Sequence, residues 1–521
     1  MLLRLASLLN EMMKVKTTSH YLELFRTSFF HTLVKDHFET IYTITIQVKN
    51  MVYKKELQDS KTDIVRSWLA TNHPKQIALL DKFEMELRLG RLSASSKSKK
   101  SPSTQISKNF GGVSSRDRRE VTFRTVELLR TLIGNTKWKN AAQLMALLKG
   151  VGTELHAAGG GKEPAIANIV LRVMCAVRDE VATAEVNEQA QASDKSGNEK
   201  KSMDPIDEES EHNHDIAVKD VETLASKAKH SQGASGISRN LSLASMLWAH
   251  PQHLMSSKRS DSFSSVDSSS DPLSNISDSG GQYPASFYVS RPQFRPAVME
   301  AIQEIMLDLE DLHKNIDEQA SAHIHAGEVI LTYSRSKTVE SFLKAAAKKR
   351  QFQVIICEGA PHYGGHTMAN SLAKDGIDTT VIHDSAAFAI MARVNKVLLP
   401  AHAVLANGGL VAPSGSHMLA LAAAHNSVPV VCLTGMFKLC PMYPHEGQDT
   451  LQELVSPSSI IDYSEMSNQT ISKVELLNPV HDYIKPDLVK LYVTNIGAFQ
   501  PSYIYRLLAE YYSSDDWGSF D

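Results

Sequence analysis

The sequence predicts an α/β protein, with an N-terminal helical bundle followed by a Rossmann-like, doubly wound, mostly parallel sheet domain. Apolar residues recur with helical spacing between residues 118 and 186. From residue 290 onward, short β-branched runs alternate with helical stretches. Strands separated by helices are joined by right-handed crossovers, which give parallel strands covered by helices on both faces. A chain of 521 residues is too long for one compact core, and its length predicts roughly two to four domains.

The first part of the chain divides into an extension, a helical segment and a joint. Residues 1–60 match no pattern that indicates a function, and we assign them none. Residues 61–117 begin with apolar positions at helical spacing that Pro74 interrupts, which predicts two helices. The stretch from 93 to 117 is polar and rich in Gly and Ser, so we expect it to form a flexible joint.

Two segments of opposite composition follow. Residues 118–186 carry successive amphipathic stripes and predict a small N-terminal helical domain. Residues 187–289 are rich in Ser, Asp, Glu, Lys and Gln and lack the apolar residues of a core, so we expect a disordered linker. A short apolar run at 241–248 is better explained as a transient helix than as a docking segment.

The last segment, residues 290–521, contains the pattern of the sheet domain. The strand-like runs are EVILTY, QVIICE, DTTVIH, KVLLP, VPVVCL and KLYVTN. The helical stretches lie at 338–350, 366–374, 384–394 and 415–425. In a sheet of this kind small-molecule sites lie at the carboxyl ends of the strands, so the loops after these runs are the candidates for chemistry.

Composition narrows the class of protein. Lys plus Arg number 55 against 58 for Asp plus Glu, a net charge of −3, so we expect no direct binding to nucleic acid. The start of the chain lacks the features of a secretory signal, and residues 39–53 are too short and too charged at their flanks to span a bilayer. The four cysteines form no CxxC pair and no disulfide framework, which predicts reduced, mostly buried thiols in a cytosolic protein. They are Cys175, Cys357, Cys432 and Cys440.

The loop after the first strand and the loop before the helical stretch at 415–425 could each bind an anion. Ser334 and Ser336 precede a helix, where hydroxyls bind phosphate or, as we prefer here, simply cap the helix. Asn407-Gly408 is a strong turn signal, and Ser416 opens a helix whose amides could hold an anion. Because the loop lacks the GxGxxG spacing of a dinucleotide site, we expect no nucleotide cofactor.

Three histidines near the second and third strand ends invite a metal interpretation. His362 and His366 have HxxxH spacing, but a Gly-Gly turn separates them, and His383 follows another strand. Because this spacing does not place the rings on one helical face, we expect interface or capping histidines and no metal site.

The C-terminal segment, residues 478–512, is rich in tyrosine. Large apolar patches on a soluble protein usually mark an interface, so one stripe of the terminal helix should pack on the sheet and the remaining aromatics should meet a partner. The residues that we expect at interfaces are His366, Tyr503, Tyr505, Leu508, Tyr511 and Tyr512.

Several long motifs resemble the beta-subunit branch of the regulatory subunits of eukaryotic translation initiation factor 2B. They are NGGL, SGSHMLALAAAHNSVP, MFKLCPMYP, NPVHDY, KPDLVKLYVTNIG and PSYIYRLLAEYY. The resemblance covers about residues 118–186 and 290–512. It implies a non-catalytic, cytosolic subunit of the guanine nucleotide exchange factor for initiation factor 2. It also implies alpha, delta, gamma and epsilon subunits as partners, and contact with the alpha subunit of factor 2 whose phosphorylation is sensed.

This family is itself similar to sugar-phosphate isomerases that include methylthioribose-1-phosphate isomerase. The likeness implies that a catalytic cysteine, arginine and aspartate are replaced here by Ser334, Ala360 and His402. Serine cannot replace a catalytic thiol, and histidine cannot replace a catalytic carboxylate, unless a partner group is repositioned. We therefore expect a vestigial pocket without catalytic residues. We assign to this pocket Ser334, Ala360, Asp384, His402, Asn407, Gly408 and Ser416.

Two other functions remain open at this point. A sugar-phosphate isomerase of the same fold is disfavoured by the three replaced residues, and should be a homodimer that is active alone. A self-assembling scaffold explains the aromatic tail but not the specific motifs. Co-purification of the other factor subunits separates both from the regulatory subunit.

Overall fold

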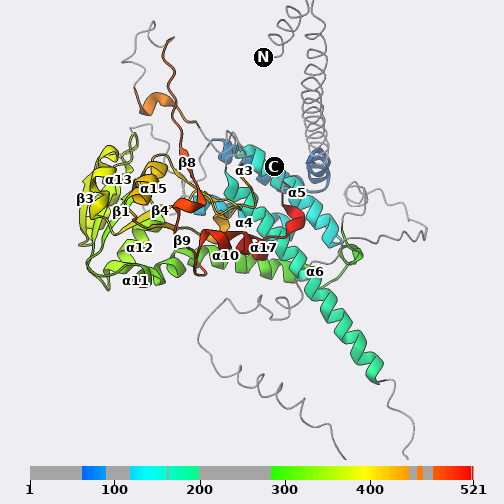
Figure 1. Cartoon of the computed structure of the whole chain (residues 1–521). Coiled ribbons are helices and arrows are strands. Elements are labelled where there is room, and N and C mark those ends of the chain that lie inside the picture. Colours follow the sequence, from blue (N-terminus) through cyan, green and yellow to red (C-terminus); the bar gives the residue numbers. More distant parts are fainter. Residues whose placement is uncertain are drawn as a thin grey trace, which may run out of the picture. The chain divides into compact units, whose positions relative to one another are not determined.

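The structure is a computed structural model that describes residues 62–89, 118–160, 163–198, 283–444, 454–461, 473–517 and 519 (Figure 1). The extension expected at 1–60, the joint at 93–117 and the apolar run at 241–248 lie outside the described residues. So does most of the linker expected at 187–289. Among the described residues, no helix combines the length and the apolar character that crossing a membrane requires.

The N-terminal helices form a bundle that we call the helical domain (residues 62–186). A helix over residues 62–72 precedes α3 (Pro74–Arg88), α4 (Arg118–Asn135), α5 (Ala141–Ala158) and α6 (Pro164–Asn198). Pro74 is the first residue of α3, where its missing N–H removes no helical hydrogen bond. Asn140 caps α5 by accepting a hydrogen bond from the Gln143 amide at 3.0 Å. α6 continues past the expected boundary at 186, because Glu, Gln and Ala after this point favour a helix.

The sheet domain (residues 283–517) is built on seven strands. They are β1 (Val329–Tyr333), β2 (Gln353–Cys357), β3 (Asp378–Ile382), β4 (Lys396–Pro400), β7 (Val430–Leu433), β9 (Leu491–Val493) and β10 (Ala498–Phe499). Their order is β10-β9-β7-β4-β1-β2-β3, and all neighbours are parallel except β9 and β10. All six strand-like runs of the sequence are therefore strands of this sheet, and the predicted fold class is confirmed.

The helices of this domain lie before, between and after the strands, and one stretch differs from the prediction. The longer ones are α10 (Phe294–Glu318), α12 (Lys337–Ala347), α13 (Gly364–Lys374), α15 (Ser416–His425) and α17 (Ile504–Tyr511). The helix expected at 384–394 is three short turns, η4 (Asp384–Ala386), α14 (Ala387–Ile390) and η5 (Met391–Arg393). Other short elements are η3 (Ala285–Tyr288), α11 (Ala320–His323), η6 (Met436–Lys438), η7 (Pro457–Ser459), η9 (Pro486–Leu488), η10 (Pro501–Tyr503) and η11 (Ser514–Asp516).

A second, antiparallel sheet was not expected from the sequence. It consists of β5 (Ala403–Val404), β6 (Leu410–Pro413) and β8 (His481–Ile484), in the order β5-β6-β8. β8 lies about seventy residues after β6 in the chain, and four residues of each strand pair. This sheet brings residues of the NGGL and NPVHDY motifs side by side.

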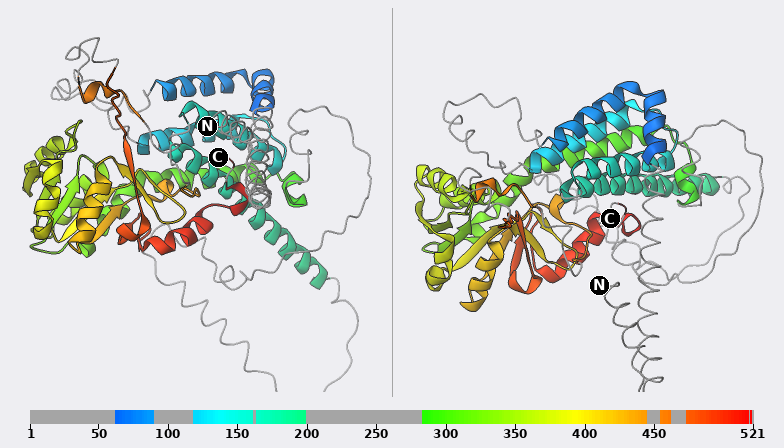
Figure 2. Two further views of the ribbon diagram at one scale, coloured as in Figure 1. Left: turned by 45° about the horizontal axis from the view of Figure 1, so that its top comes forward. Right: turned by 90° about the horizontal axis from the view of Figure 1, so that it is seen from above.

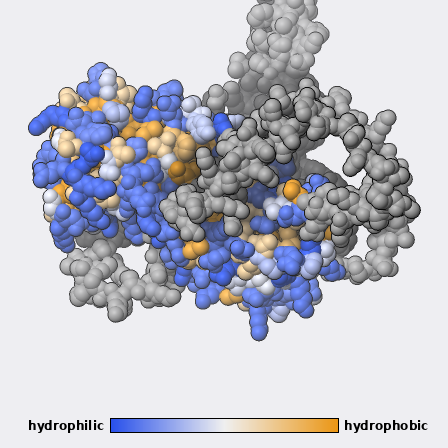
Figure 3. All heavy atoms as spheres, turned by 90° about the horizontal axis from the view of Figure 1, so that it is seen from below, coloured by the Kyte–Doolittle hydropathy of each residue, from blue (hydrophilic) through white to orange (hydrophobic). Residues whose placement is uncertain are grey.

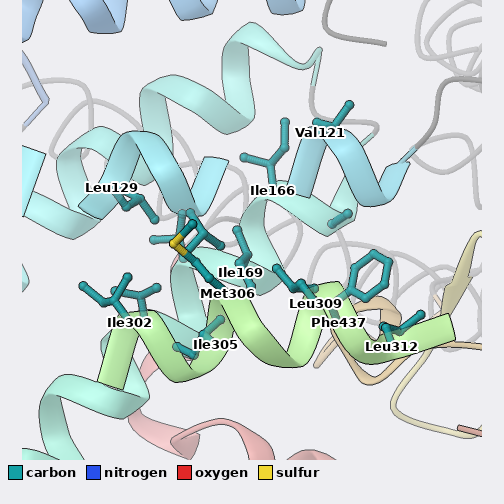
Figure 4. Packing of buried hydrophobic residues seen from close by; sticks show 14 of the residues in the cluster. Val121, Leu129, Ile166, Ile169, Ile302, Ile305, Met306, Leu309, Leu312 and Phe437 are labelled. Carbon is teal, nitrogen blue, oxygen red and sulfur yellow. The ribbon is translucent and has the colours of Figure 1, made fainter. Parts of the chain in front are cut away.

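The main sheet has a core on each face, because successive strand residues point to opposite sides. Ile330, Val354 and Leu398 face a core that includes α10, α12 and the helical domain, whereas Leu331, Ile355 and Val397 face α15 and α17. Figure 4 shows how α10 joins the two domains: its apolar side chains lie against those of helices α4 and α6, and Phe437 lies beside Leu309 and Leu312. The helical domain and the sheet domain thus share one core.

Candidate functional site

Three residues of the predicted pocket meet at the carboxyl ends of β1, β2 and β3. Asp384 accepts hydrogen bonds from two backbone amides after β2: Gly359 N at 2.9 Å from Oδ1, and Ala360 N at 2.9 Å from Oδ2. Ser334 lies against the same loop, since its own amide donates to the Cys357 carbonyl at 3.1 Å. A Cβ on Gly359 would lie 2.5 Å from the Ser334 Cβ, so glycine is needed for this close approach.

The helix after Ser334 is capped by its neighbour. Ser336 Oγ accepts a hydrogen bond from the Val339 amide at 3.4 Å at the start of α12. The capping interpretation of this loop, which the sequence favoured over phosphate binding, is confirmed for Ser336.

Tyr333 lies between Asp384 and the start of α15. Its hydroxyl lies 3.4 Å from Asp384 Oδ2, and burial, together with the charge of Asp384, raises the pKa of the phenol far above its usual range. A Cβ on Gly415 would lie 2.3 Å from the same hydroxyl, and Gly415 has a φ of 100°. The tyrosine therefore remains neutral, and it fills the space in front of the helix.

The amides at the start of α15, which the sequence offers to an anion, already bind a carboxylate of the protein. Asp482 Oδ2 accepts from Gly415 N at 2.7 Å and from His417 N at 3.1 Å. Ser416 is fully buried at this point, and its Oγ has no hydrogen-bond partner among the described residues. Asp482 comes from β8 in the second sheet, so no residue near α15 in the sequence indicates this cap.

The remaining pocket residues serve the packing of the second sheet. His402 is buried and its ring stacks on that of His481, with centroids 3.9 Å apart. Asn407 Nδ2 donates to the Tyr483 hydroxyl at 2.8 Å, and the Gly408 carbonyl accepts from the Tyr492 hydroxyl at 2.8 Å. Asn407 and Gly408 therefore contact Tyr483 and Tyr492, whereas Asp384 contacts the loop after β2.

Two of the three histidines near β2 and β3, His366 and His383, lie near one carboxylate. Glu358 lies 3.0 Å from His383 Nδ1 and 3.6 Å from His366 Nε2. The hydrogen bond with Glu358 raises the pKa of His383. His366 is exposed and touches the ring of Tyr363. Within the part of the chain that the structure describes, no group of His, Cys, Asp and Glu is arranged to hold a metal ion.

The four cysteines are all buried and reduced. Burial raises the pKa of Cys175 to about 11 and those of Cys357 and Cys440 to about 12, and it raises that of Cys432 still further. Because the thiolate is the nucleophile, these thiols are poor candidates for catalysis.

The burial of residues in the terminal helix differs from part of the sequence prediction. Leu508 and Tyr512, expected at an interface, are buried in the core of the chain, where Tyr512 donates to the Leu439 carbonyl at 3.0 Å. Tyr503 and Tyr511 are partly buried against the same core. Tyr505 is the tail tyrosine that stays exposed. Helical spacing identified the apolar stripe but could not tell whether the stripe faces the parent fold or another chain.

An apolar surface that the sequence analysis missed lies on α14 and α15. Phe388, Met418 and Leu421 are exposed there, and Phe388 contacts the ring of His425 at 5.3 Å. Apolar side chains also reach the surface of the sheet domain in the view of Figure 3. The sequence of α15 could have indicated this surface. SHMLALAAAH is apolar around its whole circumference, whereas surface helices are usually amphipathic.

The model of the initiation factor 2 subunit family matches residues 115–501, which include most of both domains. The chain belongs to the initiation factor 2 subunit family. Two relatives of the family are each named "Translation initiation factor eIF2B subunit beta". One, from Dictyostelium discoideum, is 47% identical over 258 residues, which are 50% of this chain and 64% of that protein. The other, from Schizosaccharomyces pombe, is 36% identical over 405 residues, 76% of this chain and 92% of the relative.

The crystal structure of eIF2B beta from Chaetomium thermophilum has the same fold. The match has a TM-score of 0.51 at 24% identity, and covers 87% of this chain and 97% of the other. The resemblance to the regulatory subunits of factor 2B is therefore confirmed, and the family assigns the chain to translation initiation.

Proposed function

We propose that the chain is a cytosolic, non-catalytic regulatory subunit of the guanine nucleotide exchange factor for translation initiation factor 2. Family membership and the relatives named as beta subunits support this function. In this proposal the chain pairs with a delta subunit and assembles with alpha, gamma and epsilon. It helps to bind the alpha subunit of factor 2 and to sense its phosphorylation, while exchange takes place on epsilon.

The pocket geometry supports a non-catalytic function. The amides at the start of α15, one of the two anion positions expected from the sequence, bind Asp482, and the amides after β2 bind Asp384, so each set already holds a carboxylate of the protein. A phosphate group there would meet two negative charges, which disfavour it. Among the described residues, no general base forms a hydrogen bond with the Ser334 hydroxyl, and the ring of His402 is stacked on that of His481. An acid/base isomerisation lacks its groups.

The observation that carries the proposal of an assembly subunit is the apolar surface on α14 and α15. Phe388, Met418 and Leu421 lie together on the outside of the sheet domain, where water contact costs free energy. Clustered aromatic and aliphatic side chains of this kind form the buried centres of protein interfaces. We assign this surface to contact with the delta subunit.

The test compares two leucines of similar exposure. Leu421, on the proposed surface, is 53% exposed, and Leu307, on α10, is 49% exposed. Leu421→Asp should prevent co-purification with the delta subunit, since loss of a central anchor costs about 2 kcal/mol or more, roughly a 30-fold rise in Kd. Leu307→Asp should leave pairing unchanged. Equal behaviour of the two variants would mean that the delta subunit binds elsewhere.

The alternative is a sugar-phosphate isomerase of the same fold. Native mass measurement of the complex isolated from cells distinguishes the two functions. The regulatory subunit should be found with the other factor subunits and should support nucleotide release from factor 2. A homodimer that isomerises methylthioribose 1-phosphate by itself would favour the isomerase.

A further inference from the structure

A buried carboxylate near the C-terminus binds two cations of the helical domain. Asp516 is 1% exposed, and its two oxygens accept from Arg178 Nε at 2.8 Å and from Arg178 Nη2 at 3.0 Å. Lys149 Nζ lies 3.2 Å from the same carboxylate. Arg178 belongs to α6 and Lys149 to α5, so one residue of the tail joins two helices of the other domain. A two-point contact between guanidinium and carboxylate is among the stronger polar contacts in proteins.

Aromatic rings enclose the two cations. The Arg178 guanidinium lies 5.5 Å from the ring centre of Tyr283 and 5.7 Å from that of Phe287, and Lys149 Nζ lies 5.5 Å from the Tyr283 ring. The Arg178 side chain is 16% exposed and that of Lys149 is 25% exposed, so the rings and Asp516 cover most of both cations. Removing the carboxylate would leave two charges there without a buried partner, which is costly.

A second set of contacts joins the tail and the sheet domain to α6 closer to the start of this helix, at Asn168, Leu171 and Arg172. The Arg172 guanidinium lies 4.6 Å from the ring centre of Tyr511, and its Nη1 donates to the Tyr511 carbonyl at 3.4 Å. Asn168 Nδ2 donates to the Phe437 carbonyl of the sheet domain at 3.0 Å. Leu171 packs in the same core as the apolar side chains of α17. Both views in Figure 2 show α17 and the chain end beside the helices of the helical domain.

The other face of the tail is anchored in the sheet domain. Ile504, Leu507 and Leu508 are buried in its core, and Tyr512 bonds to the Leu439 carbonyl. We propose that the segment 504–517 is an internal clamp that fixes the helical domain against the sheet domain, with Asp516 as its decisive ionic contact. This clamp is a conformational feature of the chain that goes beyond the proposed function, and it does not depend on that function.

The neighbouring aspartate provides a matched control. The Asp515 side chain is 71% exposed, and its carboxylate lies 3.3 Å from Arg178 Nη1. Both variants, Asp516→Asn and Asp515→Asn, remove one negative charge from adjacent positions in the full chain. Amide hydrogen exchange followed by mass spectrometry then reports opening in each element separately.

We expect Asp516→Asn to speed exchange in α6 and in η3 by about tenfold or more while β1, β2 and β4 keep their protection. Asp515→Asn should match the wild type. Arg178→Lys, which keeps the charge but loses the two-point contact, should give an intermediate rate if Asp516→Asn does not fold. Unchanged exchange in all three variants would overturn the proposal. So would equal acceleration in the helical domain and the central strands, because it would indicate a general loss of stability.

Discussion

Replacing Leu508 by alanine tests whether the terminal helix belongs to the core of the chain. Leu508 is fully buried in the core that covers one face of the sheet, where it lies with Ile504, Leu507 and Tyr512. A leucine-to-alanine change at such a site costs about 2–5 kcal/mol, from lost apolar burial and the cavity left behind. For a domain of this size each kcal/mol lowers Tm by about 2–4 °C, so the variant should melt about 4–20 °C lower.

Tyr505 is the control, because it lies on the same helix but is 53% exposed. Its ring meets Trp517 edge-on with centroids 5.8 Å apart, so Tyr505→Ala should cost at most about 1 kcal/mol. Thermal unfolding of both full-length variants, followed by circular dichroism, gives the comparison. If Leu508→Ala melts no lower than Tyr505→Ala yet no longer binds the delta subunit, Leu508 serves an interface and our description of the tail is refuted.

Three further predictions concern the pocket, a glycine and a carboxylate. The purified chain should not isomerise methylthioribose 1-phosphate, and Ser334→Cys should not restore activity; turnover above a no-protein control would contradict this. Gly415→Ala should destabilise more than Gly376→Ala, because both glycines have positive φ but a Cβ meets the Tyr333 hydroxyl only at Gly415; equal losses in urea unfolding would show that the contact relaxes freely. Burial raises the pKa of Glu154 to about 7 from an ordinary value of 4.5, so the folded state binds the extra proton and stability falls as pH rises through this window. Glu154→Gln should therefore reduce the loss of Tm between pH 5 and pH 8, and an unchanged loss would show that another group titrates.

The sequence by itself determined the fold class and the order of the elements. β-branched runs such as QVIIC and VVCL could only be buried strands, and the helical stretches between them fixed a parallel sheet. Ser336 as a helix cap and Pro74 as a helix start are equally local, since each acts on amides within one turn. The long motifs also determined the family, because their specificity does not depend on how the chain folds.

Tertiary structure alone decided the sites. Asp482 caps a helix whose first residues lie more than sixty positions earlier, and Asp516 binds Arg178 across 338 residues. Neither contact leaves a periodic trace in the sequence, since a contact between distant residues depends on how the elements pack. The same reason explains the terminal helix. Its apolar stripe was readable from spacing, but burial of Leu508 and Tyr512 in this chain required knowing which surface the sheet domain offers. Periodicity reports that a face is apolar, and only the assembled fold specifies what covers it.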